Sequence, residues 1–248
     1  MVGKSRNRHS NHFFVLLIFT NLCRHGAQNI KIMKEKLDTI GMILKQADKM
    51  KPRETLSGKK VFFTSDTHFN HARVLCHCNR PFRDLDEMNE ALIYYWNRVV
   101  GKNDLVFHLG DFVFGSAAAW NQVLDRLNGR IVLIAGNHDI ALLRPELIER
   151  FEHVAFEMYV VIDNQPMFLN HHPFLCYGNS HGRVWQLHGH IHSRDGHSYR
   201  FEERLPMLQP TQYDVGVDNN NYTPVSFEQV KEIINQQIKK QNEDSIHE

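Results

Sequence analysis

The chain has 248 residues, which is enough for one sizeable domain with an appendage. Hydrophobic residues make up 42% of it and charged residues 23%, so the composition indicates neither a disordered chain nor a fibrous repeat. The 29 lysines and arginines nearly balance the 28 aspartates and glutamates, which argues against a strong global attraction to nucleic acid or to an anionic membrane. Any recognition of an anion is therefore expected to be local.

The first 27 residues resemble a secretory signal in part. Basic residues precede an apolar run at 13–22, which is shorter than the roughly 20 apolar residues that cross a bilayer. The segment His25-Gly26-Ala27 is a poor cleavage site, because an imidazole stands where a small side chain is needed. We expect a cytoplasmic protein. The alternatives are export or membrane anchoring through residues 1–27, or an extension that precedes a second possible start at Met33.

An amphipathic helix is predicted over about residues 31–50. Apolar side chains recur there at alternating steps of four and three residues, at Met33, Leu37, Ile40, Leu44 and Ala47. Pro52 and Ser57-Gly58 are expected to end this helix. Residues 1–58 are therefore interpreted as an N-terminal extension, and residues 59–248 as the main domain.

From residue 59 the chain alternates short apolar runs with helical patterns. Strands are predicted at 61–65, 104–109 and 130–135, and helices at 84–100 and 117–127. Strands dominate later, at 154–162, 167–170, 184–188 and 213–217, before a final helix from Ser226 with a capping box completed by Gln229. This order is typical of an α/β domain.

Five polar clusters follow predicted strands, where ligands bind in α/β sheets. They are Asp66-Thr67-His68, Gly110-Asp111, Gly136-Asn137-His138-Asp139, Asn170-His171-His172-Pro173 and Gly189-His190-Ile191-His192. Asp-x-His and Gly-Asp are weak signals alone, because caps and turns also produce them. Gly-Asn-His-Asp is a strong signal, since four small or polar residues offer nothing to a core. Cys76-His77-Cys78 is a weaker alternative metal site, because no second ligand pair accompanies it.

Taken in this order, the five clusters resemble the calcineurin-like metallophosphoesterase superfamily over roughly residues 60–220. The segments Thr64 to Phe69, Asn79 to Phe82 and Val215 to Asp218 are most similar to a bacterial branch of small predicted phosphoesterases. The resemblance implies an α/β fold built as a four-layer α-β-β-α sandwich, here with an N-terminal helical extension.

The resemblance also implies a binuclear metal centre. One ion would be held by Asp66, His68, Asp111 and His192, and the other by Asp111, Asn137, His171 and His190. The His-x-Pro spacing of the family, matched before Pro173, implies His171 and not His172 as the ligand. Nitrogen and oxygen donors suit manganese, iron, zinc, nickel or cobalt. Neutral imidazoles are needed as ligands, so metal affinity and activity are expected to fall below roughly pH 6.

The expected reaction is hydrolysis of a phosphate mono- or diester by a hydroxide bound between the two ions. His138 is expected to act as general acid, oriented by Asp139, although Asp139 is alternatively a helix cap near residue 142. Asn137, His138 and Arg80 are candidate substrate contacts, with a structural role as the alternative for Arg80. The expected partner is a small phosphorylated substrate. Neither a membrane surface nor a run of aromatic and basic residues for long nucleic acids is evident. A non-catalytic metal-binding scaffold and a nuclease are the alternative functions.

Overall fold

The computed structural model describes residues 27–47, 55–56, 60–180, 183–198 and 200–244 of the chain. The apolar run at 13–22 and the predicted helix end at Pro52 and Ser57-Gly58 lie outside these ranges. Within them, no helix is both long and apolar enough to cross a membrane.

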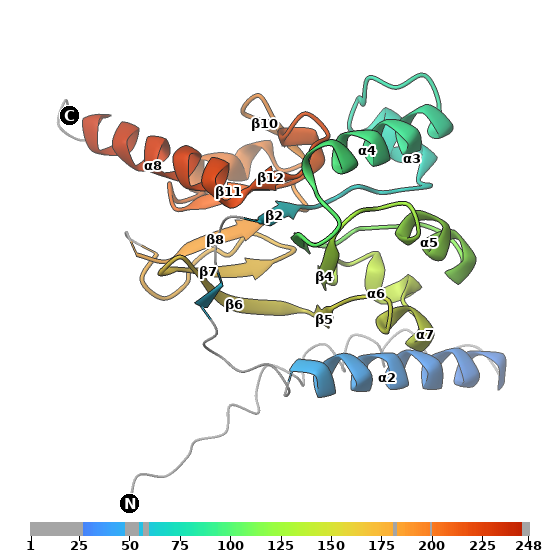
Figure 1. Cartoon of the computed structure of the whole chain (residues 1–248). Coiled ribbons are helices and arrows are strands. Elements are labelled where there is room, and N and C mark those ends of the chain that lie inside the picture. The colour runs from blue at the N-terminus through green and yellow to red at the C-terminus, as the bar shows by residue number, and fades with distance from the viewer. Residues whose placement is uncertain (1–26, 48–54, 57–59, 181–182, 199, 245–248) are drawn as a thin grey trace, which may run out of the picture.

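The first of two five-stranded sheets has the strand order β12-β2-β3-β4-β5 (Figure 1). Its strands are β2 (Val61–Thr64), β3 (Leu105–His108), β4 (Arg130–Ile134), β5 (His153–Ala155) and β12 (Val225–Ser226). Neighbours from β2 to β5 are parallel, and β12 pairs antiparallel with β2. The strands predicted at 61–65, 104–109 and 130–135 are confirmed, each slightly shorter than expected.

The second sheet has the order β1-β6-β7-β8-β11. Its strands are β1 (Thr55–Leu56), β6 (Glu157–Ile162), β7 (Gln165–Asn170), β8 (Trp185–His188) and β11 (Gln212–Asp214). The single strand predicted at 154–162 is wrong, because the chain leaves the first sheet at Ala155 and enters the second at Glu157. Strand β1 pairs with β6, so two residues of the predicted extension belong to this sheet.

The helices surround the first sheet and one edge of the second. They are α2 (Ala27–Ala47), α3 (Ala72–His77), α4 (Leu85–Val99), α5 (Ala117–Leu124), α6 (Asp139–Leu142), α7 (Pro145–Ile148) and α8 (Phe227–Asp244). Two predicted caps are confirmed. Asp84 accepts a hydrogen bond from the Glu87 amide at 2.9 Å, and Ser226 and Gln229 form the capping box.

Successive side chains of the first sheet point into two different cores. Val106 and Leu133 pack against the helices on one face, whereas Phe107 and Val132 face the second sheet. Helix α8 adds Phe227, Val230 and Ile234 to the core between the sheets. The sheet is thus covered on both faces, as parallel sheets require. The α/β fold class is confirmed.

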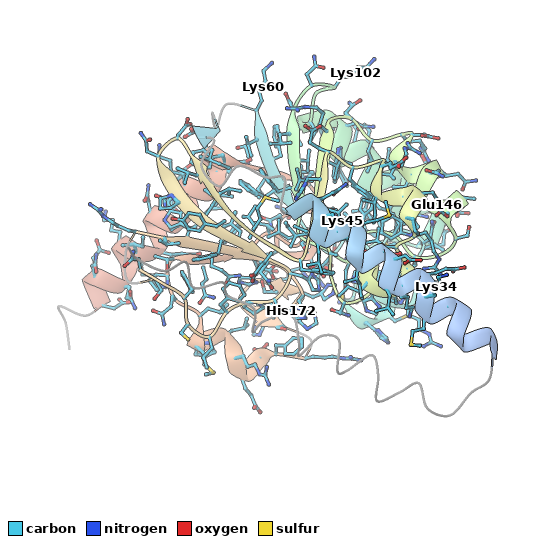
Figure 2. All side chains as sticks on the ribbon, turned by 90° about the horizontal axis from the view of Figure 1, so that it is seen from below. Lys34, Lys45, Lys60, Lys102, Glu146 and His172 are labelled. Atoms are coloured by element: carbon cyan, nitrogen blue, oxygen red, sulfur yellow. The ribbon has the colours of Figure 1, made fainter. Side chains whose placement is uncertain are left out.

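Helix α2 packs on the outside of the domain against β5 and α7. Figure 2 shows it crossing that face, with Lys34 and Lys45 along its length. Ile43 is buried, and Gln46 accepts a hydrogen bond from the backbone amide of Val154 at 2.9 Å. Because β5 is the edge strand of its sheet, this contact covers an edge that would otherwise be open to pairing.

Candidate metal centre

The predicted site residues lie where the strands of both sheets end. Asp66, Asp111 and Asn137 follow β2, β3 and β4, whose parallel ends share one edge of the first sheet. The second sheet brings its own strand ends to the same place through the segment after β11. There the Val217 amide donates to the Ser65 carbonyl at 3.0 Å, and Ser65 forms a bridge with Gly216.

Five of the seven predicted ligands have left-handed backbone conformations. The φ angles are 54° at Asp66, 50° at His68, 56° at Asp111, 71° at His190 and 46° at His192. Left-handed residues other than glycine are uncommon, and each typically costs on the order of 1–3 kcal/mol when the surroundings enforce it. Backbone strain is therefore concentrated at the predicted ligands, which is typical of functional sites.

Two glycines of the motifs permit the close approach of neighbouring loops. A Cβ atom on Gly110, where φ is 96°, would lie 2.6 Å from the Cα atom of Gly136. A Cβ atom on Gly189 would collide with the Asp66 carboxylate. The glycines of the Gly-Asp and Gly-His-x-His motifs are thus required by the close packing of these loops.

The first predicted ligand group is assembled around Asp66. The Nε2 atoms of His68 and His192 lie 3.8 Å and 3.7 Å from its Oδ1 atom. His68 Nε2 also lies 3.6 Å from Asp111 Oδ2. Candidate ligand atoms of Asp66, His68 and His192 all lie within 4.8 Å of one another. The structure thus brings together all four residues predicted for one ion.

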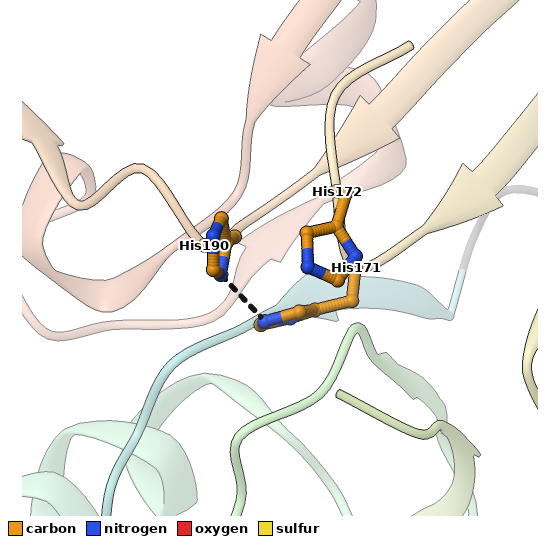
Figure 3. Close-up of side chains that lie close together, drawn as sticks. All are labelled: His171, His172 and His190. Atoms are coloured by element: carbon orange, nitrogen blue, oxygen red, sulfur yellow. Dashed lines mark hydrogen bonds between the residues drawn. The ribbon is translucent and has the colours of Figure 1, made fainter. Parts of the chain in front are cut away.

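The second predicted group converges on the other side of Asp111. His171 Nε2 lies 3.6 Å from Asp111 Oδ2, 3.1 Å from Asn137 Oδ1 and 3.2 Å from His190 Nδ1. Figure 3 shows the last contact as a dashed line, with His172 close to both rings. His171 is buried and points at Asp111, whereas His172 is exposed and packs on the His190 ring. This geometry favours His171 as the ligand.

The residues present fit divalent metal ions. Among the described residues, Asp66 Oδ1 and His68 Nε2 are buried and have no hydrogen-bond partner. Burial, and then Asp66 and Asp139, raise the pKa of Asp111 to about 9. Burial lowers the pKa of His171 to about 4 and that of His190 to about 3. A divalent cation would relieve the repulsion between the crowded carboxylates, and neutral imidazoles are the form that binds a metal.

His138 borders the site, and its imidazole is not hydrogen-bonded to the Asp139 carboxylate. Its backbone amide donates to Asp111 Oδ1 at 3.0 Å, and its Nε2 atom lies 3.7 Å from Asp111 Oδ2. The Asp139 carboxylate accepts instead from the backbone amides of Asp111 at 2.7 Å, Phe112 at 2.9 Å and Gly136 at 2.9 Å. The expectation that Asp139 orients the His138 imidazole does not fit this geometry. Asp139 is the first residue of α6 and holds the loop that carries Asp111.

Arg80 lies behind the site and not in it. Its buried guanidinium donates to both Asp218 oxygens, at 2.9 Å and 2.8 Å, and to the backbone carbonyls of Asp66 and Thr67. The expected substrate contact of Arg80 does not fit, because its donors are engaged inside the protein. The geometry fits the structural role that was the alternative for Arg80.

Asp218 is a residue whose role the sequence patterns did not reveal. Its Oδ2 atom accepts from His192 Nδ1 at 2.7 Å, on the opposite side of the ring from Asp66. Burial would raise the pKa of Asp218, but Arg80 and His192 lower it to about 2, so it is a carboxylate at neutral pH. It directly follows the strand predicted at 213–217, which is the same signal that identified the other clusters, although the observed strand ends at Asp214.

A cavity of about 170 Å³, here called the site cavity, opens over the predicted ligands. Its wall includes Asp111, Asn137, His138 and His190. His71 also lines it, stacks on Phe114 at 3.8 Å between ring centroids, and contacts His68 Nδ1 at 3.2 Å through its own Nδ1 atom. The predicted ligands are therefore accessible to a small molecule.

Comparisons with known proteins agree with this geometry. The sequence profile of the calcineurin-like phosphoesterase family matches residues 59–244. An uncharacterized protein of Methanocaldococcus jannaschii is 36% identical over 184 residues, covering 72% of this chain and 93% of that protein. The Gene 66 protein of Mycobacterium phage D29 is 30% identical over 205 residues, covering 71% of this chain and 96% of that protein.

A solved structure shows the same fold. It is a protein of unknown function from Aquifex aeolicus, with a TM-score of 0.54 and 21% sequence identity, covering 70% of this chain and 98% of that chain. The extent of the family match and the identity to the Methanocaldococcus jannaschii protein decide the assignment. The chain belongs to the calcineurin-like phosphoesterase family.

Proposed function

We propose that this protein hydrolyses a phosphate mono- or diester with two divalent metal ions and with His138 as general acid. One observation carries the proposal. Side chains from five loops converge on Asp66 and Asp111, and buried ligand atoms among the described residues are left without a partner. Membership of the family supports metal-dependent hydrolysis of phosphoesters as the reaction class.

The ligand residues divide into two groups that share Asp111. Asp66, His68, Asp111 and His192 would hold one ion, and Asp111, Asn137, His171 and His190 the other. A carboxylate suits the shared position because its two oxygens can face two cations. These nitrogen and oxygen donors suit manganese, iron, zinc or nickel. When bound, such ions neutralise charge on the phosphate oxygens and make coordinated water more acidic.

His138 is placed to deliver a proton to the leaving oxygen. Its side chain is 43% exposed and lines the site cavity, within reach of an ester held at the ligands. Burial lowers the pKa of His138, while Asp66 raises it. The net shift is downward, and a phosphate anion beside the ring would oppose it and favour the protonated imidazole that a general acid requires. Asn137 borders the same cavity and is the proposed second contact to the phosphate.

The test is turnover of 4-nitrophenyl phosphate and bis(4-nitrophenyl) phosphate by the full chain after chelation and after adding back manganese. We expect no turnover after chelation and recovery with the metal. Plasmid and single-stranded DNA in parallel test the nuclease alternative. Two ions bound per chain without turnover of any of these esters would favour the scaffold alternative and overturn the proposal.

A further inference from the structure

A second cavity adjoins the site cavity. It has a volume of about 130 Å³ and is here called the side cavity. Both cavities are lined by His190, Ile191 and Phe201. His190 is a predicted ligand, so a phosphate held at the ligands lies at the boundary between the two cavities. One substituent of that phosphate can enter the site cavity and another the side cavity.

The two cavities differ in chemistry. The site cavity presents imidazoles, carboxylate and amide groups, with Arg200 at its wall, beside the apolar side chains of Val74, Ile191 and Phe201. The apolar side chains of the side cavity come from three segments, with Pro173 in the first, Ile191 in the second, and Phe201, Leu205 and Leu208 in the third. Its cation, Arg204, lies over the face of the Phe201 ring at 5.7 Å from the ring centroid. Binding of an apolar group to such a surface is favoured because it displaces water, whereas a polar group would find no hydrogen-bond partner on that surface.

The size of the side cavity limits its occupant. An apolar cavity of roughly 150 Å³ accommodates one benzene ring. The side cavity is therefore of the right size for a single six-membered ring or a short alkyl chain. His172 completes its wall and packs on His190 at 4.3 Å between ring centroids, so an occupant would lie directly beside the candidate metal centre.

We infer that the side cavity binds the second ester group of a phosphodiester, and that this group is apolar or aromatic and no larger than one ring. The inference rests on the proposed function and narrows it from either ester class to diesters. A monoester carries one organic group and would leave one cavity unused. Hydrolysis of the diester adds water across one phosphorus–oxygen bond and leaves a phosphomonoester and an alcohol.

The test compares binding of diphenyl phosphate and dimethyl phosphate, which carries no ring, to the manganese-loaded full chain by isothermal titration calorimetry. The variant is Leu205→Ser, at a half-buried position in the 3-10 helix Glu202–Met207 that lines the side cavity. We expect the wild type to bind the diphenyl ester more tightly, and Leu205→Ser to weaken its binding about tenfold while leaving the dimethyl ester unchanged. The matched control is Met207→Ser, at an exposed position of the same helix, which should change neither affinity.

Parallel turnover of bis(4-nitrophenyl) phosphate and 4-nitrophenyl phosphate separates this inference from the proposed function. We expect Leu205→Ser to lower kcat/KM about tenfold for the diester and to leave the monoester unchanged. Equal effects of Leu205→Ser on the diphenyl and dimethyl esters, or no effect on either, would overturn the side cavity assignment even if turnover is normal. Selective loss of diphenyl phosphate binding without any turnover would keep the side cavity assignment and overturn the proposed function.

Discussion

The Nδ1 atom of His192 lies 2.7 Å from the Oδ2 atom of Asp218, while the Nε2 atom of the same ring faces Asp66 at 3.7 Å. Asp218 therefore fixes which imidazole nitrogen is presented to the candidate metal centre. Arg80 holds that carboxylate in turn through two hydrogen bonds. A carboxylate behind a ligating histidine orients the ring and strengthens it as a donor.

Replacing Asp218 by Asn should weaken metal binding about 10- to 100-fold, because the imidazole loses its anionic partner. The affinity is measured by competition of manganese with a chromophoric chelator, and folding by circular dichroism. The control is Asp195→Asn, an exposed aspartate in the neighbouring turn. A folded Asp218→Asn variant with wild-type manganese affinity would remove the orienting role of Asp218.

His138→Ala should keep both metal ions but lose ~10²–10⁴ in kcat, since the ring is not needed as a ligand and is placed to protonate the leaving oxygen. Asp111→Asn should lose metal, because its carboxylate lies between the two ligand groups. The measurement is the metal content per chain after gel filtration, with kcat determined on the same samples. Equal metal loss in both variants would exclude His138 from the proposed role.

Asp139→Asn should destabilise the protein by about 2–4 kcal/mol, because an amide cannot accept from all three backbone N–H groups that the carboxylate binds. The measurement is urea unfolding with an unchanged m value. Asp125→Asn is the matched control, as its surface pair with Arg150 should contribute less than about 1 kcal/mol. A stable Asp139→Asn variant with slowed turnover would instead favour the original expectation that Asp139 orients His138.

Stability of the metal-free protein should fall with acid in part through His108. Burial, and then His171, lower the pKa of His108 in the folded protein to about 3, against an ordinary value of 6.5. Its Nδ1 atom accepts from the Gly110 amide at 3.2 Å, which a second ring proton would oppose. The unfolded chain takes up that proton first, so the contribution is complete above pH 6.5 and is lost as the pH falls toward 3.

Between pH 7.5 and pH 5 the loss through His108 amounts to about 2 kcal/mol. His108→Asn in a chelating buffer should therefore show a smaller decrease in unfolding free energy over this range than the wild type. His197→Asn, at an exposed position, should retain the wild-type decrease. Equal decreases in the wild type and in His108→Asn would contradict the buried neutral state of His108.

The sequence was sufficient to single out the candidate ligand residues, which the structure brings together, and most strands. Each candidate ligand follows a short apolar run, and parallel strands present such positions at one edge. The periodicity of the Met33 to Ala47 segment also predicted its helix. Periodicity did not reveal the break between Ala155 and Glu157, because Phe156 between the two strands carries no turn signal, and the change of sheet depends on pairing with β4 and β7.

The sequence by itself determined the family, the α/β class and which side chains are candidate metal ligands, because local motifs carry that chemistry. The tertiary structure decided the roles of Arg80, Asp139 and Asp218. Arg80 is buried because Asp218, 138 residues further along the chain, supplies the opposing charge. Asp139 is bound by backbone amides of the loop after β3, which its own neighbours in sequence could not indicate. Such pairings depend on which loops meet, and only the packing of the two sheets establishes that.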